Sequence, residues 1–406
     1  MLFAGIDIAK YDHVIGAVDE RGLPLSKPMS FKNSQAGFGK LAAYLAGLSD
    51  DKADIVIGME ATGHYWLACF CFLSEQGYEV AVINPLRTDA MRRFKNGGKV
   101  KTDAIDCVVI ADTLRCGDFS PSRLADEKMM SLRHMTRLRQ AMTESAADAK
   151  RQVIVALDQV FPEYGTLFSD MFGETSKAFL KRCPTPEECE SIDIRTLTNL
   201  LDKASHGHLG RDKAAELKKA AKGSCGIRVA NDAFSFQIKL LAKQIEFIEG
   251  QAAEVDEKIK ALLDEIEPLI LTIPGISYKL GAQIVAEIGD VRRFKNAGAI
   301  VKYAGINPSK SQSGTFEGDI NHITKQGSPY LRRALYLAAM AQLKCKTPLH
   351  GYYLKKRSEG KAHREALIAV ARKLVHVIFA VLSKQEPYNP AYPSAGEKRH
   401  ALNDSV

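Results

Sequence analysis

Two carboxylates three residues apart begin the segment where chemistry is easiest to place. Asp103 and Asp106 follow Thr102, a good helix N-cap, so a helix starting here would carry both acids on one face. Like charges on one face repel, and a divalent metal ion is the usual reason to keep them, because hard cations bind carboxylate oxygens. The plain alternative is a solvated helix start, where acids favour the positive end of the dipole. Asp112, six residues beyond Asp106, lies off this face and is expected to tolerate Asn.

Two more acids occur where strands would position them. Residues 2–9 predict a buried strand containing Asp7, where a carboxylate is costly unless it is paired or bound to metal. A later predicted strand ends at Glu60. Sites in sheets covered by helices gather at strand ends. Asp7, Glu60, Asp103 and Asp106 are therefore expected to converge on Mg²⁺ ions as a two-metal site for phosphoryl transfer.

The elements around these acids predict an α/β domain over residues 1–120. Three strands come first and can form an antiparallel meander. Helix, strand, helix and strand follow as βα units, which gives a mixed sheet with helices on both faces. A loop and the helix of Asp103 complete the domain. The predicted strands are 2–9, 12–18, 29–31, 54–59 and 78–83, and the predicted helices between them are 34–48 and 64–77.

A basic stretch separates the last of these strands from the paired acids. Over residues 87–101, predicted as a loop, six Lys and Arg oppose a single acid, Asp89. A basic loop beside a metal site suits a phosphate-rich polymer, although a flexible solvated loop has the same composition. The candidate nucleic-acid contacts in it are Arg92, Arg93, Lys95, Lys99 and Lys101.

Residues 121–266 are predicted to be almost entirely helical. Apolar residues recur at helical spacing over 125–161, and over 234–266 they alternate steps of four and three, which is the seam of a coiled coil. The seam would pair with the 125–161 helix inside one chain, or with a second copy in a homodimer or homotetramer. A long helix on a monomeric core is the plain alternative. An insert, residues 162–225, lies between the two long helices. Its predicted helices are 194–204 and 211–222.

The region 267–385 carries signs of nucleic-acid binding. Ile273-Pro274-Gly275-Ile276 and the apolar stretch after it resemble a helix-hairpin-helix element, whose turn amides face a DNA phosphate, although a plain helical turn has the same pattern. Over residues 325–373 twelve Lys and Arg oppose two Glu, with four Tyr interleaved, which is typical of a nucleic-acid surface. The candidate contacts are Gly275, Lys310, Lys325, Arg332, Arg333, Lys355, Lys356 and Arg357.

Composition bounds the class of protein. The 406 residues are 46% hydrophobic and 26% charged, ordinary for two or three globular domains, and the net charge of +8 suggests a polyanionic partner. Eight scattered cysteines without a Cys-x-x-Cys pair predict reduced thiols in a cytoplasmic protein. We find no signal peptide and no uncharged run long enough to span a bilayer, so no membrane is expected. Residues 386–406 predict a disordered tail.

Taken in order, these stretches resemble a known family. They are similar to the DEDD transposases of insertion sequences related to the Piv DNA invertase, which are recombinases guided by an element-encoded bridge RNA. The motifs that carry the resemblance are Gly5-Ile-Asp7-Ile-Ala-Lys10, Met59-Glu60-Ala-Thr-Gly63, Val82-Ile-Asn-Pro85, Lys101-Thr-Asp103-Ala-Ile-Asp106, Ile273-Pro-Gly275-Ile276, Gly305-Ile-Asn-Pro308 through Ser313-Gly314, and Gly327 through Tyr336.

The resemblance implies an RNase H-like (RuvC-type) domain that bears the four acids, a coiled-coil linker and a helical C-terminal transposase domain. In that last domain a serine attacks DNA and becomes covalently joined to it, and by motif position it is Ser313. Mg²⁺ is the implied cofactor, and donor DNA, target DNA and a bridge RNA are the implied partners. The insert 162–225 is longer than in compact members, a departure that concerns the linker and the assembly rather than the chemistry.

Two other functions share part of the pattern. A Holliday-junction resolvase-like nuclease would use the same acids with water as the nucleophile, and Ser313 would then be irrelevant. An actin- or sugar-kinase-type ATPase shares an early strand aspartate, but we find no second Gly-rich phosphate loop and no adenosine motif in the chain. A covalent protein–DNA adduct would exclude the nuclease, and ATP turnover without DNA would favour the ATPase.

Overall fold

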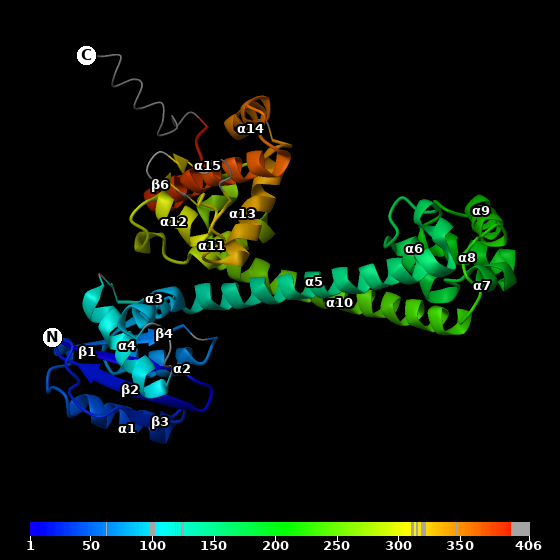
Figure 1. Cartoon of the computed structure of the whole chain (residues 1–406). Coiled ribbons are helices and arrows are strands. Elements are labelled where there is room, and N and C mark those ends of the chain that lie inside the picture. Colours follow the sequence, from blue (N-terminus) through cyan, green and yellow to red (C-terminus); the bar gives the residue numbers. More distant parts are fainter. Residues whose placement is uncertain are drawn as a thin grey trace, which may run out of the picture. The chain divides into compact units, whose positions relative to one another are not determined.

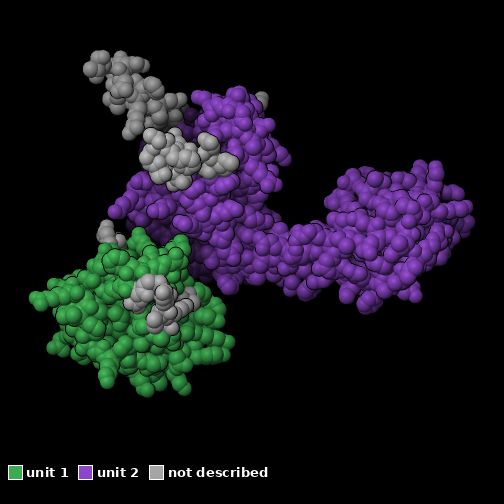
Figure 2. Space-filling view, viewed as in Figure 1, with its two compact units in different colours: residues 1–124 green, residues 125–406 purple. Residues whose placement is uncertain are grey.

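The computed structural model describes residues 1–61, 63–96, 102–117, 119, 121–122, 126–309, 312–313, 316–317, 322–345 and 347–390. Contacts within the chain divide it into two units, residues 1–124 and residues 125–406, which Figure 1 traces along the sequence and Figure 2 colours separately.

Unit 1 contains a five-stranded sheet in the order β3-β2-β1-β4-β5. The first three strands form an antiparallel meander, and β4 and β5 run parallel to β1. This confirms the predicted mixed sheet, and the strand order fits the RNase H-like domain that the resemblance implies. The strands are β1 Leu2–Asp7, β2 Asp12–Val18, β3 Met29–Lys32, β4 Ile55–Glu60 and β5 Glu79–Ile83.

The described helices of unit 1 are α1 Gln35–Ala46, α2 Trp66–Glu75, α3 Pro85–Asn96 and α4 Asp103–Cys116. Thr102 caps α4 as predicted, since its hydroxyl accepts from the backbone N–H of Ile105. Helix α3 shows that the predicted loop was wrong over residues 87–96, while residues 97–101 lie outside the described part of the chain. Pro85 is its first residue, and Asn84 Oδ1 accepts from Leu86 N at 2.9 Å, which together make a sound helix start.

A row of glycines lets α4 lie directly on the sheet. Gly5 of β1 is paired with Gly16 of β2 on one side and with Gly58 of β4 on the other. A Cβ on Gly5 would lie 2.0 Å from the backbone oxygen of Cys107, so only glycine fits beneath the helix. A Cβ on Gly58 would lie 2.6 Å from Leu114 Cδ1. The glycine row therefore fixes how close α4 comes to β1, β2 and β4.

The opposite face of the sheet makes the main core of unit 1. Alternate strand residues such as Ile6 and Ile57 are fully buried, together with Leu41 of α1 and Phe70 of α2. This period of two is what a strand with one packed face requires.

Unit 2 is organised around two long helices that lie side by side, α5 Glu127–Val160 and α10 Asn231–Ile266 (Figure 1). The predicted seam of α10 is the face that packs on α5. Ile238 and Ile245 share one core with Val153 of α5, and Ile259 shares another with Leu132. Because α5 covers the seam within the chain, its burial needs no second copy.

The insert packs on one end of this helix pair. Its helices are α6 Glu174–Arg182, α7 Pro186–Ser191, α8 Ile194–Ala204 and α9 Arg211–Lys222, so the predicted helices 194–204 and 211–222 are confirmed. Tyr164, Phe179, Leu197 and Leu217 are buried in one core with residues of α5 and α10.

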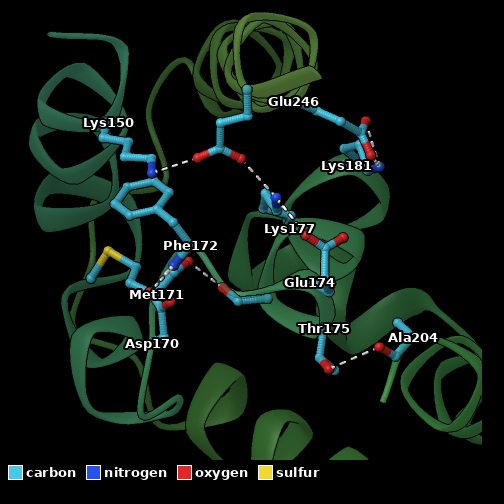
Figure 3. Close-up of polar contacts among 12 residues, drawn as sticks. Lys150, Asp170, Met171, Phe172, Glu174, Thr175, Lys177, Lys181, Ala204 and Glu246 are labelled. Carbon is cyan, nitrogen blue, oxygen red and sulfur yellow. Dashed lines mark hydrogen bonds and ion pairs between the residues drawn. The ribbon is translucent and has the colours of Figure 1, made fainter. Parts of the chain in front are cut away.

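Ion pairs also join the insert to the long helices (Figure 3). Lys177 of α6 reaches Glu249 Oε2 at 2.9 Å, and Lys150 of α5 reaches Oε1 of the same carboxylate at 2.6 Å. Lys181 contacts Glu246 at 2.8 Å. Burial opposes ionisation of Glu249, but the hydrogen bonds from Lys150 and Lys177 outweigh it and lower the pKa of that carboxyl.

The other described α-helices of unit 2 form a separate core. They are α11 Tyr278–Ile288, α12 Ala297–Tyr303, α13 Pro329–Gln342, α14 Pro348–Ser358 and α15 His363–Lys384. Helix α15 is long and apolar enough to cross a membrane. Its residues Leu367, Val370, Leu374 and Ile378 are, however, fully buried in this core, which accounts for its apolar composition.

The start of the predicted tail is ordered against the same core. Tyr388 packs on it, and its backbone N–H donates to Thr272 Oγ1 at 2.8 Å. The prediction of disorder from residue 386 was therefore wrong for these first residues. Residues 391–406 lie outside the described part of the chain.

Candidate active site and nucleic-acid contacts

The ends of β1 and β4 bring two of the predicted acids to one edge of the sheet. The strands are adjacent and parallel, with the pair of Ile6 and Met59 as the last in register. Asp7 and Glu60 are the next residue of each strand, so both leave the sheet at its carboxyl edge. This is the edge where sites form in sheets of this kind.

Helix α4 brings the other two acids toward Asp7. Cys107 lies over Gly5, and Asp7 shares that face because it is two residues further along the strand. Burial raises the pKa of the Cys107 thiol to about 12, and the charges of Asp7 and Asp106 add to the rise. Both acids must therefore lie near Cys107. Asp103 is exposed in the same first turn of α4.

Side chains of α3 engage two of these acids. Arg92 Nε donates to Asp106 Oδ1 at 2.9 Å, and the two side chains are 14% and 5% exposed. Thr88 Oγ1 donates to Glu60 Oε2 at 2.6 Å. Arg92, predicted as a nucleic-acid contact, and Asp106, predicted as a metal ligand, are thus partners of each other in this structure.

The four acids suit Mg²⁺ by their chemistry, because carboxylate oxygens are the ligands that hard cations prefer. Within the part of the chain that the structure describes, however, no three His, Cys, Asp or Glu side chains are grouped closely enough to hold a metal ion. The fold brings the predicted ligands to one edge, while Arg92 and Thr88 engage oxygens of Asp106 and Glu60. Metal binding at these oxygens would exchange those contacts for metal bonds.

Asp112 is a buried acid whose importance the sequence did not reveal. Its side chain is fully buried and forms ion pairs with Lys95 and with Arg115, the latter at 2.9 Å. Neutralising a buried carboxylate between two cations is costly, which argues against the expected tolerance of Asn. Lys95, predicted to contact nucleic acid, is engaged by Asp112 instead.

The predicted nucleophile belongs to a loop whose two limbs are paired by backbone hydrogen bonds. Gln312–Ser313 forms β6, which pairs antiparallel with β7, Phe316–Glu317. Lys310 and the side chain of Ser313 lie outside the described part of the chain, so their functions stay predictions. The bonds between the limbs are Ser309 N to His322 O at 2.7 Å, Thr324 N to Asn307 O at 3.0 Å, and Lys325 N to Gly305 O at 3.0 Å.

A buried carboxylate that sequence reasoning missed anchors the base of this loop. Glu287 of α11 is fully buried and accepts from Arg137 Nε at 2.7 Å and from Arg137 Nη2 at 3.0 Å. Ser328 Oγ donates to Glu287 Oε2 at 2.8 Å, and Ser328 N donates to Tyr303 O at 2.8 Å. The signal in the sequence was an acid between Ala286 and Ile288 in an otherwise apolar stretch.

The predicted helix-hairpin-helix turn is tied to α13. Gly275 has φ +79°, a value that favours glycine, and Gln342 Nε2 donates to the carbonyl of Pro274. The turn leads into α11, which Ser277 caps, but only a short 3-10 turn, Leu269–Thr272, directly precedes it. A contact of Gly275 with DNA phosphate stays a prediction.

The other basic residues predicted to contact nucleic acid differ in whether they already bind a partner within the chain. Arg93 pairs with Asp89 at 2.8 Å, and Lys356 pairs with Glu359 at 2.5 Å. The guanidiniums of Arg332 and Arg357 donate to backbone carbonyls. Described residues give no ion pair to Lys325, Arg333 or Lys355, while Lys99 and Lys101 lie outside the described residues.

Relatives of this chain span nearly its whole length. It is 26% identical over 398 residues to the 44.8 kDa protein of insertion element IS116 from Streptomyces clavuligerus, covering 97% of each chain. It is 26% identical over 407 residues to the 42 kDa protein of IS900 from Mycobacterium paratuberculosis, covering 97% of this chain and 98% of that protein. It is 23% identical over 361 residues to the pilin gene-inverting protein of Moraxella bovis, covering 89% and 90%.

Among solved structures, that of T. thermophilus RuvC in complex with a Holliday junction substrate covers 30% of this chain and 99% of its own, at 16% identity and a TM-score of 0.23. A transposase model of the IS110 DEDD type matches residues 4–162, and the model of the IS116/IS110/IS902 transposase family matches residues 267–354. These matches together cover more than half of the sequence, and the chain belongs to the IS110 family of DEDD transposases.

Proposed function

We propose that this protein is the DNA recombinase of an insertion sequence, which cuts and rejoins strands of donor and target DNA under the guidance of a bridge RNA. The main support for the proposal is the set of residues that the two family matches cover. One includes Asp7, Glu60, Asp103 and Asp106, and the other includes the loop of Ser313. All eight cysteines are free thiols, which is what we expect of a protein that acts on DNA in the reducing cytoplasm.

Ser313 is the proposed nucleophile. Its Oγ forms a bond to phosphorus as the bond from phosphorus to a sugar oxygen breaks, and the hydroxyl proton passes to a base. The freed sugar oxygen, or one from a second strand, reverses the step by attacking the phosphoserine. Because each break is matched by a new bond of the same kind, strands are exchanged without ATP.

Asp7, Glu60, Asp103 and Asp106 are the proposed holders of Mg²⁺, which when bound stabilises charge on phosphate oxygens. Arg92 offsets the negative charge of Asp106 where the acids crowd together. Asp103→Asn should abolish strand cleavage and leave nucleic-acid binding nearly intact. Asp232→Asn is the matched control, because Asp232 is also an exposed acid in the first turn of a helix. Recombination by Asp103→Asn at the parental rate would defeat this part of the proposal.

Trapping on denaturing gels tests the serine directly. The protein is incubated with DNA, guide RNA and Mg²⁺, and a covalent protein–DNA band is expected for the wild type but not for Ser313→Ala. Ser309→Ala is the control in the same loop, since Ser309 Oγ merely donates to His322 O at 2.9 Å. An adduct that persists in Ser313→Ala would refute the assignment. Metal-dependent cleavage without any adduct would instead favour a nuclease that uses water.

A homo-oligomer through the α5–α10 pair belongs to the proposal, but its surface cannot be the seam that α5 covers. The outward side of α10 carries Phe236, Leu240 and Phe247, which are 70%, 55% and 66% exposed. We propose that this side joins two copies. Replacing the three residues by Ser should reduce the sedimentation coefficient while the fold stays intact, and an unchanged value would remove the interface.

A further inference from the structure

We propose that a group of arginines and tyrosines at the base of the serine loop binds a phosphodiester of the DNA strand. This arginine cluster consists of Arg133, Arg137, Arg293, Tyr303 and Tyr330. The inference rests on the proposed function, because it is the serine loop that would bring a DNA strand here.

Three separate segments of unit 2 assemble the arginine cluster. Arg137 of α5 lies over the ring of Tyr330 in α13, with 4.4 Å between the guanidinium carbon and the ring centre. Arg293 lies against Tyr303 of α12, 4.8 Å from the centre of its ring. Arg133 of α5 donates from Nε to the carbonyl of Ala286 at 2.8 Å. Residues far apart in the sequence thus place three guanidiniums together.

Positive charge exceeds negative charge in the arginine cluster. Glu287 is the carboxylate that Arg137 holds, and the nearby Asp290 is engaged by Arg292 at 2.9 Å. Burial lowers the pKa of Arg133, and Arg293 and Arg137 lower it further against the opposing effects of Tyr303 and Glu287. The guanidinium of Arg133 therefore lies in a region of excess positive charge, and a bound anion would reduce the repulsion among the three arginines. Neutralising the buried carboxylate of Glu287 needs only one of the three arginines.

The way the guanidiniums are held leaves donors for such an anion. Stacking on an aromatic ring uses the flat face of arginine and leaves the N–H groups at its edge, which match two phosphate oxygens. Among the described residues Arg293 makes one hydrogen bond, from Nη2 to the Glu287 carbonyl at 3.3 Å. The side chain of Arg137 is 41% exposed although it binds a fully buried carboxylate. Arg293 is exposed as well, so a phosphate can reach both arginines from solvent.

The position of the arginine cluster selects DNA as the ligand. Tyr303 accepts from the backbone of Ser328, and Ser328 Oγ donates to Glu287, so the residues that frame the arginine cluster also close the base of the loop. Ser313 lies on that loop. A strand presented to the serine would pass its neighbouring phosphates over this base.

The experiment compares Arg293→Gln with Arg292→Gln in the full chain. Arg292 is the matched control because it is the adjacent residue, is 87% exposed and is already paired with Asp290. Affinity for a nonspecific DNA duplex is measured as the salt concentration is varied, and an RNA duplex of the same sequence serves as the second arm. Losing one phosphate contact on DNA lowers the salt slope by about 0.9, so the wild type should lose about 3.5-fold more affinity than Arg293→Gln between roughly 50 and 200 mM salt.

We expect this reduced slope on DNA for Arg293→Gln and an unchanged slope for Arg292→Gln. Arg293→Lys should restore the slope, since it keeps the charge, and should bind more weakly, since it lacks the fork of donors. A slope equal to the wild type in a folded Arg293→Gln protein would overturn the inference, and so would an effect confined to RNA. Adduct formation by the wild type tests the proposed function separately, so the experiments distinguish failure of the proposed function from failure of the phosphate contact.

Discussion

Gly5→Ala should destabilise unit 1 strongly, because the new methyl group has no room between β1 and α4. Its Cβ would lie 2.0 Å from Cys107 O and 2.5 Å from Ala111 N, both backbone atoms that cannot rotate away. Restoring an ordinary contact requires α4 to move by about 1 Å or more, in a packed interior where overpacking costs about 1–3 kcal/mol or occasionally more. We expect about 3 kcal/mol or more, since neither element can yield by a side-chain rotation.

Gly39→Ala is the matched control for this substitution. Gly39 is exposed in the middle of α1, and a Cβ there meets nothing within 4 Å. The alanine should stabilise the helix by about 0.5–1 kcal/mol. The two variants should therefore differ by roughly 4 kcal/mol in opposite directions, although they carry the same chemical change.

Hydrogen exchange read by mass spectrometry is the assay, because peptides from β1, β4 and α4 report on unit 1 separately from unit 2. The free energy of opening in those peptides should fall in Gly5→Ala and rise slightly near α1 in Gly39→Ala. Peptides from α5 and α10 should be unaffected. Protection of α4 in Gly5→Ala equal to that of the wild type would refute the close packing of α4 on the glycine row.

Three further predictions concern unit 2. Glu287→Gln leaves Arg137 without its carboxylate and should cost about 3–5 kcal/mol in urea unfolding, with the loss located by exchange in α11 and α13; full stability would contradict an anchoring function. Burial raises the pKa of Asp256, but hydrogen bonds from Lys279 and Arg139 outweigh it, so the folded pKa lies below the unfolded one. That stabilisation is present above about pH 4 and lost as the pH falls through the folded pKa, so Asp256→Asn should flatten the acid limb of a stability–pH profile. Ile245→Asp should unfold the α5–α10 pair, seen as lost helical circular dichroism, rather than separate intact copies.

Local patterns in the sequence predicted much of this fold. The five strands are bounded by turn residues and were located to within a few positions, and α8 and α9 were predicted with the bounds that the structure has. Helix α3 was missed because its basic composition was interpreted as a loop that contacts a phosphate-rich polymer. The start signal, Asn84 followed by Pro85, lies directly after the last predicted strand.

Contacts between distant residues could not be predicted in the same way. The partner of Glu287 is Arg137, 150 residues earlier, and nothing local to either residue identifies the other. Likewise Asp112 and Lys95 pair because α3 packs beside α4, which depends on a helix that the sequence reading did not include. The order of the acids along the chain was informative because strand ends and helix starts are local features. The identity of their partners was not, since it is decided by packing.

The two long helices also act as a ruler. At 1.5 Å per residue, the 34 residues of α5 span about 51 Å, and α10 runs beside it. The number of residues in these helices therefore sets the distance between the insert and the C-terminal core. A change of about seven residues, two helical turns, keeps nearly the same face inward. A change of this spacing is therefore accommodated best in whole helical turns, made in α5 and α10 together. Two residues added to one helix alone would rotate its apolar stripe by about 200°, away from its partner.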